Sequence, residues 1–189
     1  MKLNIRDLDP SCVWFTSDHH FGHKSIIKHC DRPFEDVHSM DKEMMTRWNA
    51  TIKPADTVFY LGDLSFHPRS KTRQIVESLT GNIVLIIGNH DKEPEGFYKG
   101  IFETVLFYAE LKSTQEFGLG RITICHYPFR SWNLSNHGGW NIHGHCHGRN
   151  PLVQNQLDVS VDAHNFYPVN LLQVRELMDK KKTEVDEQK

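Results

Sequence analysis

The sequence lacks the features of a membrane or secreted protein. No apolar run approaches the roughly 18 residues that a membrane-spanning helix requires, and the N-terminus shows no basic stretch followed by an apolar one, as a secretory signal would. The four cysteines form no CxxC pair and no regular framework, which argues against a disulfide scaffold. We therefore expect a cytoplasmic protein with reduced thiols and no membrane partner.

The sequence also lacks a strong net charge. With 22 basic and 24 acidic residues the formal net charge is -2, so the charge balance does not attract the chain to nucleic acid or to an anionic membrane. A local basic rim around a cleft would not show in this sum. We therefore expect a small molecule as the binding partner. Nucleic acid is a possible partner that the charge balance does not favour.

The length and the end of the chain give the domain prediction. A chain of 189 residues is the size of one domain with a substantial core. We predict a single domain over residues 1–189. The last residues, about 182–189, are mostly Lys, Glu, Asp and Gln, a composition that predicts a flexible tail.

Histidine is the residue type in excess. The chain has 13 histidines, and most of them lie in a few clusters that directly follow short apolar runs. Clustered histidine beside aspartate and asparagine indicates a metal site, because these side chains supply the nitrogen and oxygen ligands that divalent cations take.

The first half of the chain alternates between two kinds of pattern. Short apolar runs predict strands, and apolar residues at helical spacing predict helices between them. The predicted strands are 12–16, 57–61 and 83–87, and the predicted helices are 24–30, 39–49 and 70–79. This alternation indicates parallel strands joined by right-handed crossovers.

The second half changes character. We interpret the runs 102–111 and 120–125 as a hairpin or as adjacent strands of a second sheet. Segment 129–140 is rich in Gly, Asn and Ser and is predicted to be irregular. Further strands are predicted at 157–161 and 169–171, followed by a helix that ends at about Lys181.

Five polar motifs stand at the ends of these strands. Each one alone is weak, because a lone D-x-H or G-D pair is usually a turn or a satisfied polar group. Five in this order, each after an apolar run, are very hard to explain by chance. In chain order they are Asp18-x-His20, Gly62-Asp63, Gly88-Asn89-His90-Asp91, His126, and Gly144-His145-x-His147.

The set resembles the motifs of the calcineurin-like metallophosphoesterase superfamily, from Asp18 to His147 with none missing. The opening Ser17–His23 and the segment 161–169 are similar to those of small bacterial and phage phosphoesterases. The resemblance implies an α/β fold, a four-layer α-β-β-α sandwich of two mixed β-sheets flanked by helices. It also implies a dinuclear metal site at the C-terminal ends of the strands.

A pair of divalent cations needs one shared anionic ligand and neutral donors around it, and Asp63 is the natural bridge. The resemblance implies the other ligands, namely Asp18, His20 and His147 for the first metal, and Asn89, His126 and His145 for the second. Manganese is the expected metal, although such nitrogen and oxygen ligands also accept iron, zinc, nickel or cobalt.

His90 is the motif histidine outside this ligand set. The resemblance places it near the leaving oxygen, and we assign it as general acid or charge stabiliser. The nucleophile would be a metal-bridging hydroxide that attacks phosphorus in line. Asp91 is the second catalytic candidate, because it could orient His90. It could equally accept hydrogen bonds from the loop backbone.

The substrate contacts are less defined. Arg149 is the best candidate, because a guanidinium binds phosphate oxygens in pairs, although a surface salt bridge would also account for it. His23 and the metal ligand Asn89 are further candidates for substrate binding. The expected substrate is a small phosphoester or a nucleotide, as a monoester or a diester. Trp132 and Trp140 could stack a base, or they could pack their own loop.

Two other classes of function compete with an enzyme. A structural zinc site could use Cys125, Cys146 and the nearby histidines, but their spacing is not that of a zinc finger, and Asp18 and Asp63 would be unexplained. The fold could also serve as a catalytically silent metal-binding scaffold, which normally lacks ligands or the general acid. Because this sequence contains every metal ligand and the general acid, we favour the hydrolase. A nuclease is the alternative form of that enzyme.

Overall fold

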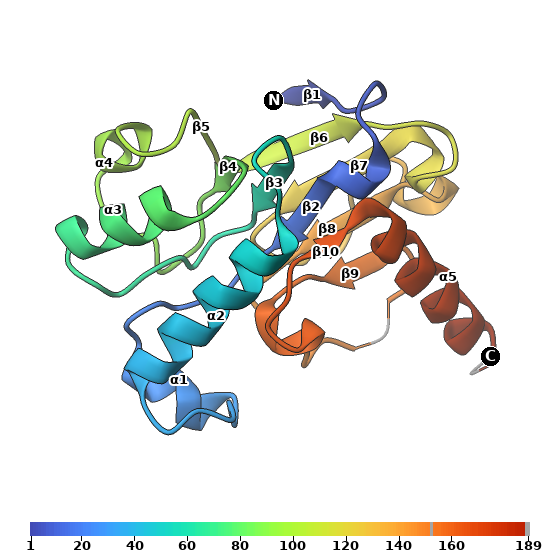
Figure 1. Cartoon of the computed structure of the whole chain (residues 1–189). Helices are drawn as coiled ribbons and strands as arrows, with labels where there is room; N and C mark the ends of the chain where they lie inside the picture. The colour runs from blue at the N-terminus through green and yellow to red at the C-terminus, as the bar shows by residue number, and fades with distance from the viewer. Residues whose placement is uncertain (152, 188–189) are drawn as a thin grey trace.

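The structure is a computed structural model that describes residues 1–151 and 153–187. In this range two β-sheets pack face to face, with helices flanking them (Figure 1). The fold class predicted from the sequence, an α/β protein with two mixed sheets flanked by helices, is confirmed.

The first sheet carries the predicted parallel strands. Its order is β10-β2-β3-β4-β5, in which β2 to β5 run parallel and β10 is antiparallel to β2. The strands are β2 (Val13–Thr16), β3 (Thr57–Tyr60), β4 (Asn82–Ile86), β5 (Thr104–Leu106) and β10 (Val169–Asn170). The carboxyl ends of the four parallel strands therefore meet at one edge of the sheet.

The second sheet is mixed, in the order β1-β6-β7-β8-β9. Its strands are β1 (Lys2–Asn4), β6 (Tyr108–Lys112), β7 (Arg121–Cys125), β8 (Trp140–His143) and β9 (Gln156–Asp158). Strands β7, β8 and β9 are parallel, and β6 is antiparallel to β7. The hairpin expected from the runs 102–111 and 120–125 is therefore formed by β6 and β7.

The run 102–111 is divided between the two sheets rather than forming one strand. Its first part, β5, pairs with β4, and its second part, β6, pairs with β7. Phe107 is the crossing point between them, and its side chain is exposed. Apolar alternation gives no information on pairing partners, so the sequence pattern could not reveal this division.

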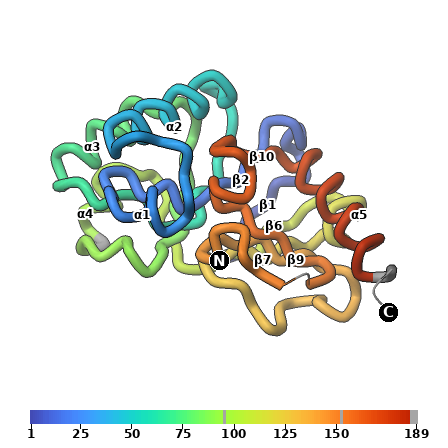
Figure 2. The backbone as a smooth tube through the Cα atoms, turned by 90° about the horizontal axis from the view of Figure 1, so that it is seen from below, coloured from blue at the N-terminus to red at the C-terminus, as the bar shows by residue number. Residues whose placement is uncertain are grey.

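Four helices cover the outer face of the first sheet, on one side of Figure 2. They are α1 (Lys24–His29), α2 (Val37–Thr51), α3 (Arg69–Ser78) and α4 (Glu95–Lys99). Helix α2 begins at a capping box of Asp36 and Ser39, two residues before the predicted start. Its Met40, Met44 and Trp48 are buried against the sheet, as the helical spacing predicts.

The two sheets bury an apolar core between them. Phe15 and Phe59 on the first sheet stack with ring centroids 5.5 Å apart, and they belong to one cluster with Ile122, Ile124 and Ile142 of the second sheet. Because alternate residues of a strand point to opposite faces, Trp14 and Tyr60 instead enter the core beneath the helices. This double burial fixes the strand ends that carry the polar motifs.

Helix α5 (Leu171–Glu187) packs along the sandwich on the other side of the molecule (Figure 2). It buries Val174 and Met178 and contacts the edge strands β9 and β10. The helix continues through residues 182–187, where the sequence predicts a flexible tail, because Lys, Glu and Thr extend a helix that packing has already fixed. Residues 188 and 189 lie outside the described residues. No helix in the described ranges is long and apolar enough to span a membrane.

Candidate metal centre

The predicted ligands come together where the strand ends of the two sheets meet. The loop after β2 carries Asp18 and His20, the loop after β3 carries Asp63, and the loop after β4 carries Asn89. From the second sheet, β7 is followed by His126, and β8 by His145 and His147. Each ligand thus follows a strand whose core packing holds its position.

Five of the seven predicted ligands have a left-handed backbone conformation. Their φ angles, in chain order, are 59°, 54°, 57°, 71° and 52° for Asp18, His20, Asp63, His145 and His147. Residues other than glycine rarely adopt this region, and such strain is often found at functional sites. The i, i+2 pairs predicted on an extended or turning backbone therefore lie on tight turns.

One group of ligand atoms surrounds the Asp18 carboxylate. Asp18 Oδ1 lies 3.8 Å from His20 Nε2 and 3.8 Å from His147 Nε2, and His20 Nε2 lies 3.5 Å from Asp63 Oδ2. Ligand atoms bonded at about 2.0–2.1 Å to one tetrahedral cation lie about 3.4 Å from each other. The separations therefore fit a single cation held by Asp18, His20 and His147, with Asp63 beside His20.

The same atoms are buried without an alternative use. Among the described residues, Asp18 Oδ1 and His20 Nε2 have no hydrogen-bond partner, and an unpaired buried polar atom is costly. Burial raises the pKa of Asp18, but His20, His126 and His147 lower it, to about 2. An ionised, unpartnered carboxylate oxygen that faces two imidazoles fits a divalent cation.

A second group of ligand atoms lies across Asp63. His126 Nε2 is 3.6 Å from Asp63 Oδ2 and 2.9 Å from Asn89 Oδ1. His126 Nδ1 is 2.7 Å from the carbonyl oxygen of Leu61, which assigns the ring proton to Nδ1 and leaves a lone pair on Nε2. The His145 ring lies beside that of His126, with centroids 5.1 Å apart. Asp63 thus lies between both groups, as a bridging ligand must.

Glycine is required at three motif positions because the loops approach so closely. A Cβ on Gly88 would lie 2.3 Å from Asp63 Oδ1, and one on Gly62 would lie 2.5 Å from the nitrogen of Gly88. A Cβ on Gly144 would lie 2.4 Å from Asp18 Oδ2. These glycines therefore let the loops that carry the ligands pack directly on one another.

His90 lies at the entrance of the centre. Its Nε2 is 4.0 Å from Asp63 Oδ2 and its side chain is 36% exposed, while its backbone N–H donates to Asp63 Oδ1 at 2.8 Å. In the described part of the chain its Nδ1 has no hydrogen-bond partner. An imidazole that is anchored through its backbone and is partly open to solvent is suited to meet a substrate.

Asp91 accepts hydrogen bonds from the loop backbone, one of the two roles that the sequence left open. One carboxylate oxygen accepts the backbone N–H groups of Asp63 and Gly88, both at 2.8 Å, and the other accepts that of Leu64 at 2.9 Å. Burial raises the pKa of Asp91, against these hydrogen bonds, which lower it. Asp91 thereby joins the loops after β3 and β4 through its hydrogen bonds, and its part in catalysis stays a prediction.

A buried arginine that the sequence analysis did not identify supports the first group of ligands. Arg32 donates to the backbone carbonyls of Asp18 and His19, each at 2.7 Å, and forms two hydrogen bonds of 2.8 Å to Asp162. Asp162 in turn lies 2.6 Å from His147 Nδ1. This carboxylate therefore orients the imidazole of His147 toward Asp18.

The two substrate-binding candidates differ in position. His23 adjoins the centre, with its ring 5.6 Å from that of His20, and burial and then the neighbouring His20 lower its pKa to about 4. Arg149 is exposed and its guanidinium donates to the carbonyl oxygen of His29. The structure therefore places His23 beside the metal ligands. Arg149 instead contacts the backbone of His29.

The remaining histidine and cysteine of the motifs point elsewhere. His19 is fully buried under the helices, bonds Tyr60 Oη at 2.8 Å, and has a pKa lowered to about 3 by burial. A separate group of His143, Cys146 and Asp158 could be considered for the structural zinc alternative. However, both nitrogens of His143 and both carboxylate oxygens of Asp158 are already hydrogen-bonded.

The irregular segment 129–140 packs against the second sheet. Trp132 donates from Nε1 to the carbonyl oxygen of Gly139 at 2.8 Å, and Trp140 is buried on β8. The loop is also held through Phe129, whose N–H donates to Asn141. These two tryptophans therefore pack the loop rather than face the metal ligands.

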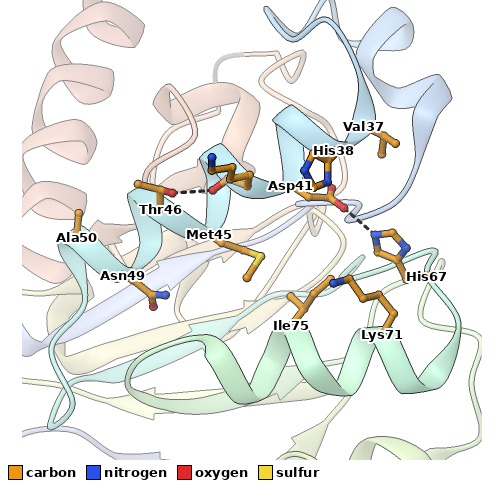
Figure 3. Close-up of a pocket in the computed structure, with 11 residues that line it drawn as sticks. Val37, His38, Asp41, Met45, Thr46, Asn49, Ala50, His67, Lys71 and Ile75 are labelled. Atoms are coloured by element: carbon orange, nitrogen blue, oxygen red, sulfur yellow. Dashed lines mark hydrogen bonds and ion pairs between the residues drawn. The ribbon is translucent and has the colours of Figure 1, made fainter.

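A cavity of about 720 Å³ lies between α2 and α3, away from the metal ligands (Figure 3). Met45 of α2 and Ile75 of α3 line it. At one end Asp41 and His67 form a hydrogen bond of 2.7 Å, and Asp41 also accepts the N–H of Gly22 at 3.0 Å. This pair ties α2 to the loop after β3 and to the loop after β2.

Two stacked sheets bring their Asp- and His-rich loops together at a shared edge, an arrangement that suits a metal-dependent phosphoesterase. The chain belongs to the calcineurin-like phosphoesterase family, whose model matches residues 13–185.

Several similar proteins cover most of the chain. Uncharacterized protein MJ1445 of Methanocaldococcus jannaschii is 36% identical, over 90% of this chain and 93% of that protein. The Gene 66 proteins of Mycobacterium phages L5 and D29 are 28% and 29% identical, over 81% and 89% of this chain and 87% and 96% of theirs.

A solved structure shows the same fold. It is that of AQ665, a protein of unknown function from Aquifex aeolicus, which aligns with a TM-score of 0.68 over 87% of this chain and 98% of that chain. At 24% sequence identity this likeness supports the fold alone.

Proposed function

We propose that this protein is a dinuclear-metal-dependent phosphoester hydrolase whose substrate is a small phosphoester or a nucleotide, either a monoester or a diester. The main support is the arrangement around Asp63. One carboxylate oxygen lies 3.5 Å from His20 Nε2 and 3.6 Å from His126 Nε2, and the unpaired Asp18 Oδ1 belongs to the same cluster.

The ligands divide into two sets that share Asp63. Asp18, His20 and His147 would hold one cation, and Asn89, His126 and His145 the other. Two bound divalent cations supply Lewis-acid catalysis, because they polarise the phosphoryl oxygens and lower the pKa of water. We expect manganese, with iron, zinc, nickel or cobalt as other metals that these ligands accept.

His90 gives the proposed site its acid. Its Nε2 is close to the bridging ligand, and its ring is not used by a protein hydrogen bond in the described residues. A neutral leaving alcohol requires a proton, and His90 is placed to donate it at the oxygen that departs. No protein nucleophile is required by this proposal.

The test is turnover by the manganese-loaded protein. We expect hydrolysis of p-nitrophenyl phosphate, of bis-p-nitrophenyl phosphate, or of both, and a panel of mono-, di- and cyclic nucleotides would identify the preferred ester. Metal analysis of the same sample must show two ions per chain. If such a sample hydrolyses no phosphoester, the catalytically silent scaffold is the better description, and degradation of DNA or RNA alone would favour the nuclease.

A further inference from the structure

A second cavity opens directly beside His90. Its volume is about 420 Å³, and Phe66, Phe97 and Lys92 line it together with His90. Cavities of this size bind small molecules in many proteins. Because one of its walls is the proposed proton donor, the cavity adjoins the place where a leaving group would depart.

Phe66 is an exposed aromatic ring that connects this cavity to the metal ligands. Its ring stacks on His23 with centroids 4.0 Å apart and lies 5.1 Å from the ring of His90 and 5.4 Å from that of His20. The residue is nevertheless 42% exposed. An exposed aromatic surface beside the reacting groups is suited to stack a flat ring and to remove it from water.

The loop that carries Phe66 is fixed in place before any ligand binds. The N–H of Phe66 donates to the carbonyl oxygen of Phe21 at 2.8 Å, and the adjacent His67 is held by Asp41 on α2 (Figure 3). A Cβ on Gly22 would lie 2.7 Å from the His67 ring, so the two loops are in close contact. A preorganised ring loses little conformational entropy on binding.

From these contacts we infer that Phe66 and the adjoining cavity form a subsite for the leaving group, and that it takes a planar aromatic group such as a nucleobase. The inference rests on the proposed function, because His90 defines the leaving side. It narrows the substrate to phosphoesters that release an aryl alcohol or a nucleoside. Lys92 at the same cavity adds a positive charge and suits polar edges of a base.

The experiment compares two monoesters whose leaving groups have similar acidity, 2-naphthyl phosphate and hexafluoroisopropyl phosphate, by release of inorganic phosphate. Phe66→Ala is expected to lower the ratio of their kcat/KM values (naphthyl over alkyl) by about 5- to 100-fold, the range found when a stacking ring is removed. Phe66→Trp should retain the ratio.

Tyr127→Ala is the matched control. Tyr127 is 44% exposed and touches the rings of His126 and His145, on the other group of ligands, so its loss should leave the naphthyl-to-alkyl ratio intact. Metal content and melting temperature of every variant verify that it is folded. Phe66→Leu, which preserves apolar volume, replaces Phe66→Ala if the latter does not fold.

A binding measurement separates this inference from the proposed function. Adenosine is expected to shift the amide resonances of Phe66 and His90, and ribose is not. If the metal-loaded wild type hydrolyses neither these esters nor any monoester, diester or nucleotide of the panel above, but adenosine binds, the hydrolase proposal is wrong and the aromatic subsite stands. If wild type is active, yet Phe66→Ala leaves the ratio unchanged and adenosine causes no shift, the subsite is overturned.

Discussion

At the scale of single residues, Asp63 is constrained both in its side chain and in its backbone. Its Oδ2 faces one imidazole from each ligand group, its Oδ1 accepts the N–H of His90, and its backbone has a φ of 57°. The side chain must therefore supply negative charge while the backbone holds an unfavourable conformation. Asparagine tolerates that conformation as well as aspartate does, which makes the charge separately testable.

Asp63→Asn is expected to lose metal, because an amide cannot supply the negative charge that two cations share. Metal per chain, measured by elemental analysis after dialysis, should fall well below two. Asp31→Asn is the control, since Asp31 also has a positive φ, of 49°, but is exposed. A fully loaded Asp63→Asn protein would contradict the bridging role.

His90→Ala tests the proton donor. We expect kcat to fall by roughly 10²- to 10⁴-fold, with metal content unchanged because His90 is outside both ligand groups. The effect should be largest for esters with poor leaving groups, which depend most on protonation. His137→Ala, an exposed residue of the short 3-10 helix Ser135–His137, is the control. Normal turnover of alkyl esters by His90→Ala would remove this residue from the acid role.

At the scale of elements, Arg32 is the connection between segments that are distant in sequence. It lies between α1 and α2, bonds the carbonyls at the end of β2, and reaches Asp162 in the short helix Val161–His164. Asp162 then orients His147 after β8. One guanidinium thus fixes the relative position of a loop from each sheet.

Asp162→Asn is expected to weaken metal binding by about 10- to 100-fold, as the loss of a carboxylate that orients a histidine ligand commonly does. The measurement is competition with a chelator of known affinity. Asp179→Asn, an exposed change on α5 with a side chain 71% exposed, should have no such effect. Equal metal affinity of the wild type and Asp162→Asn would show that His147 needs no orientation.

The sequence predicted the elements that carry the motifs better than the contacts that support them. Each motif follows an apolar run, so local pattern and spacing were enough to place the seven ligand candidates at strand ends. Arg32 and Asp162 are separated by 130 residues and belong to none of those motifs, so no local pattern reveals their contact. Asp91 was identified from its motif, but its hydrogen bonds to the two loops join residues that no local pattern connects.

At the scale of the whole molecule, the ligands are divided between the sheets. Four of the seven follow strands of the first sheet, and three follow strands of the second. Cations bound between them would connect the two sheets through their loops. Ligands that bind only the native state stabilise it in proportion to RT ln(1 + [L]/Kd).

Metal removal is therefore expected to lower the melting temperature. A metal concentration of 100 times Kd contributes about 2.7 kcal/mol, which corresponds to about 5–10 °C for a protein of this size. Thermal unfolding with manganese and after chelation measures the shift. The Asp63→Asn protein should show a smaller one, and identical melting temperatures of loaded and chelated wild type would contradict shared binding by the two sheets.

The overall architecture was predicted from the order of strand and helix patterns along the sequence. The features that were not predicted have physical causes. The alternation of strands and helices predicted the parallel strands β2, β3 and β4. Strand β1, which pairs with β6, has three residues. It is too short to show the apolar alternation that predicts a strand. The crossing at Phe107 and the full length of α5 depend on tertiary packing, which overrides local preference.

The hydrogen bonds of Asp91 have a consequence for local opening motions. Its one carboxylate accepts the amides of Asp63, Leu64 and Gly88, so none of the three can separate from it without exposing the same buried charge. In native-state hydrogen exchange these amides are expected to share a single opening free energy, although they belong to two loops. The loops after β3 and β4 then act as one cooperative unit, and Asp91→Asn would split it into two.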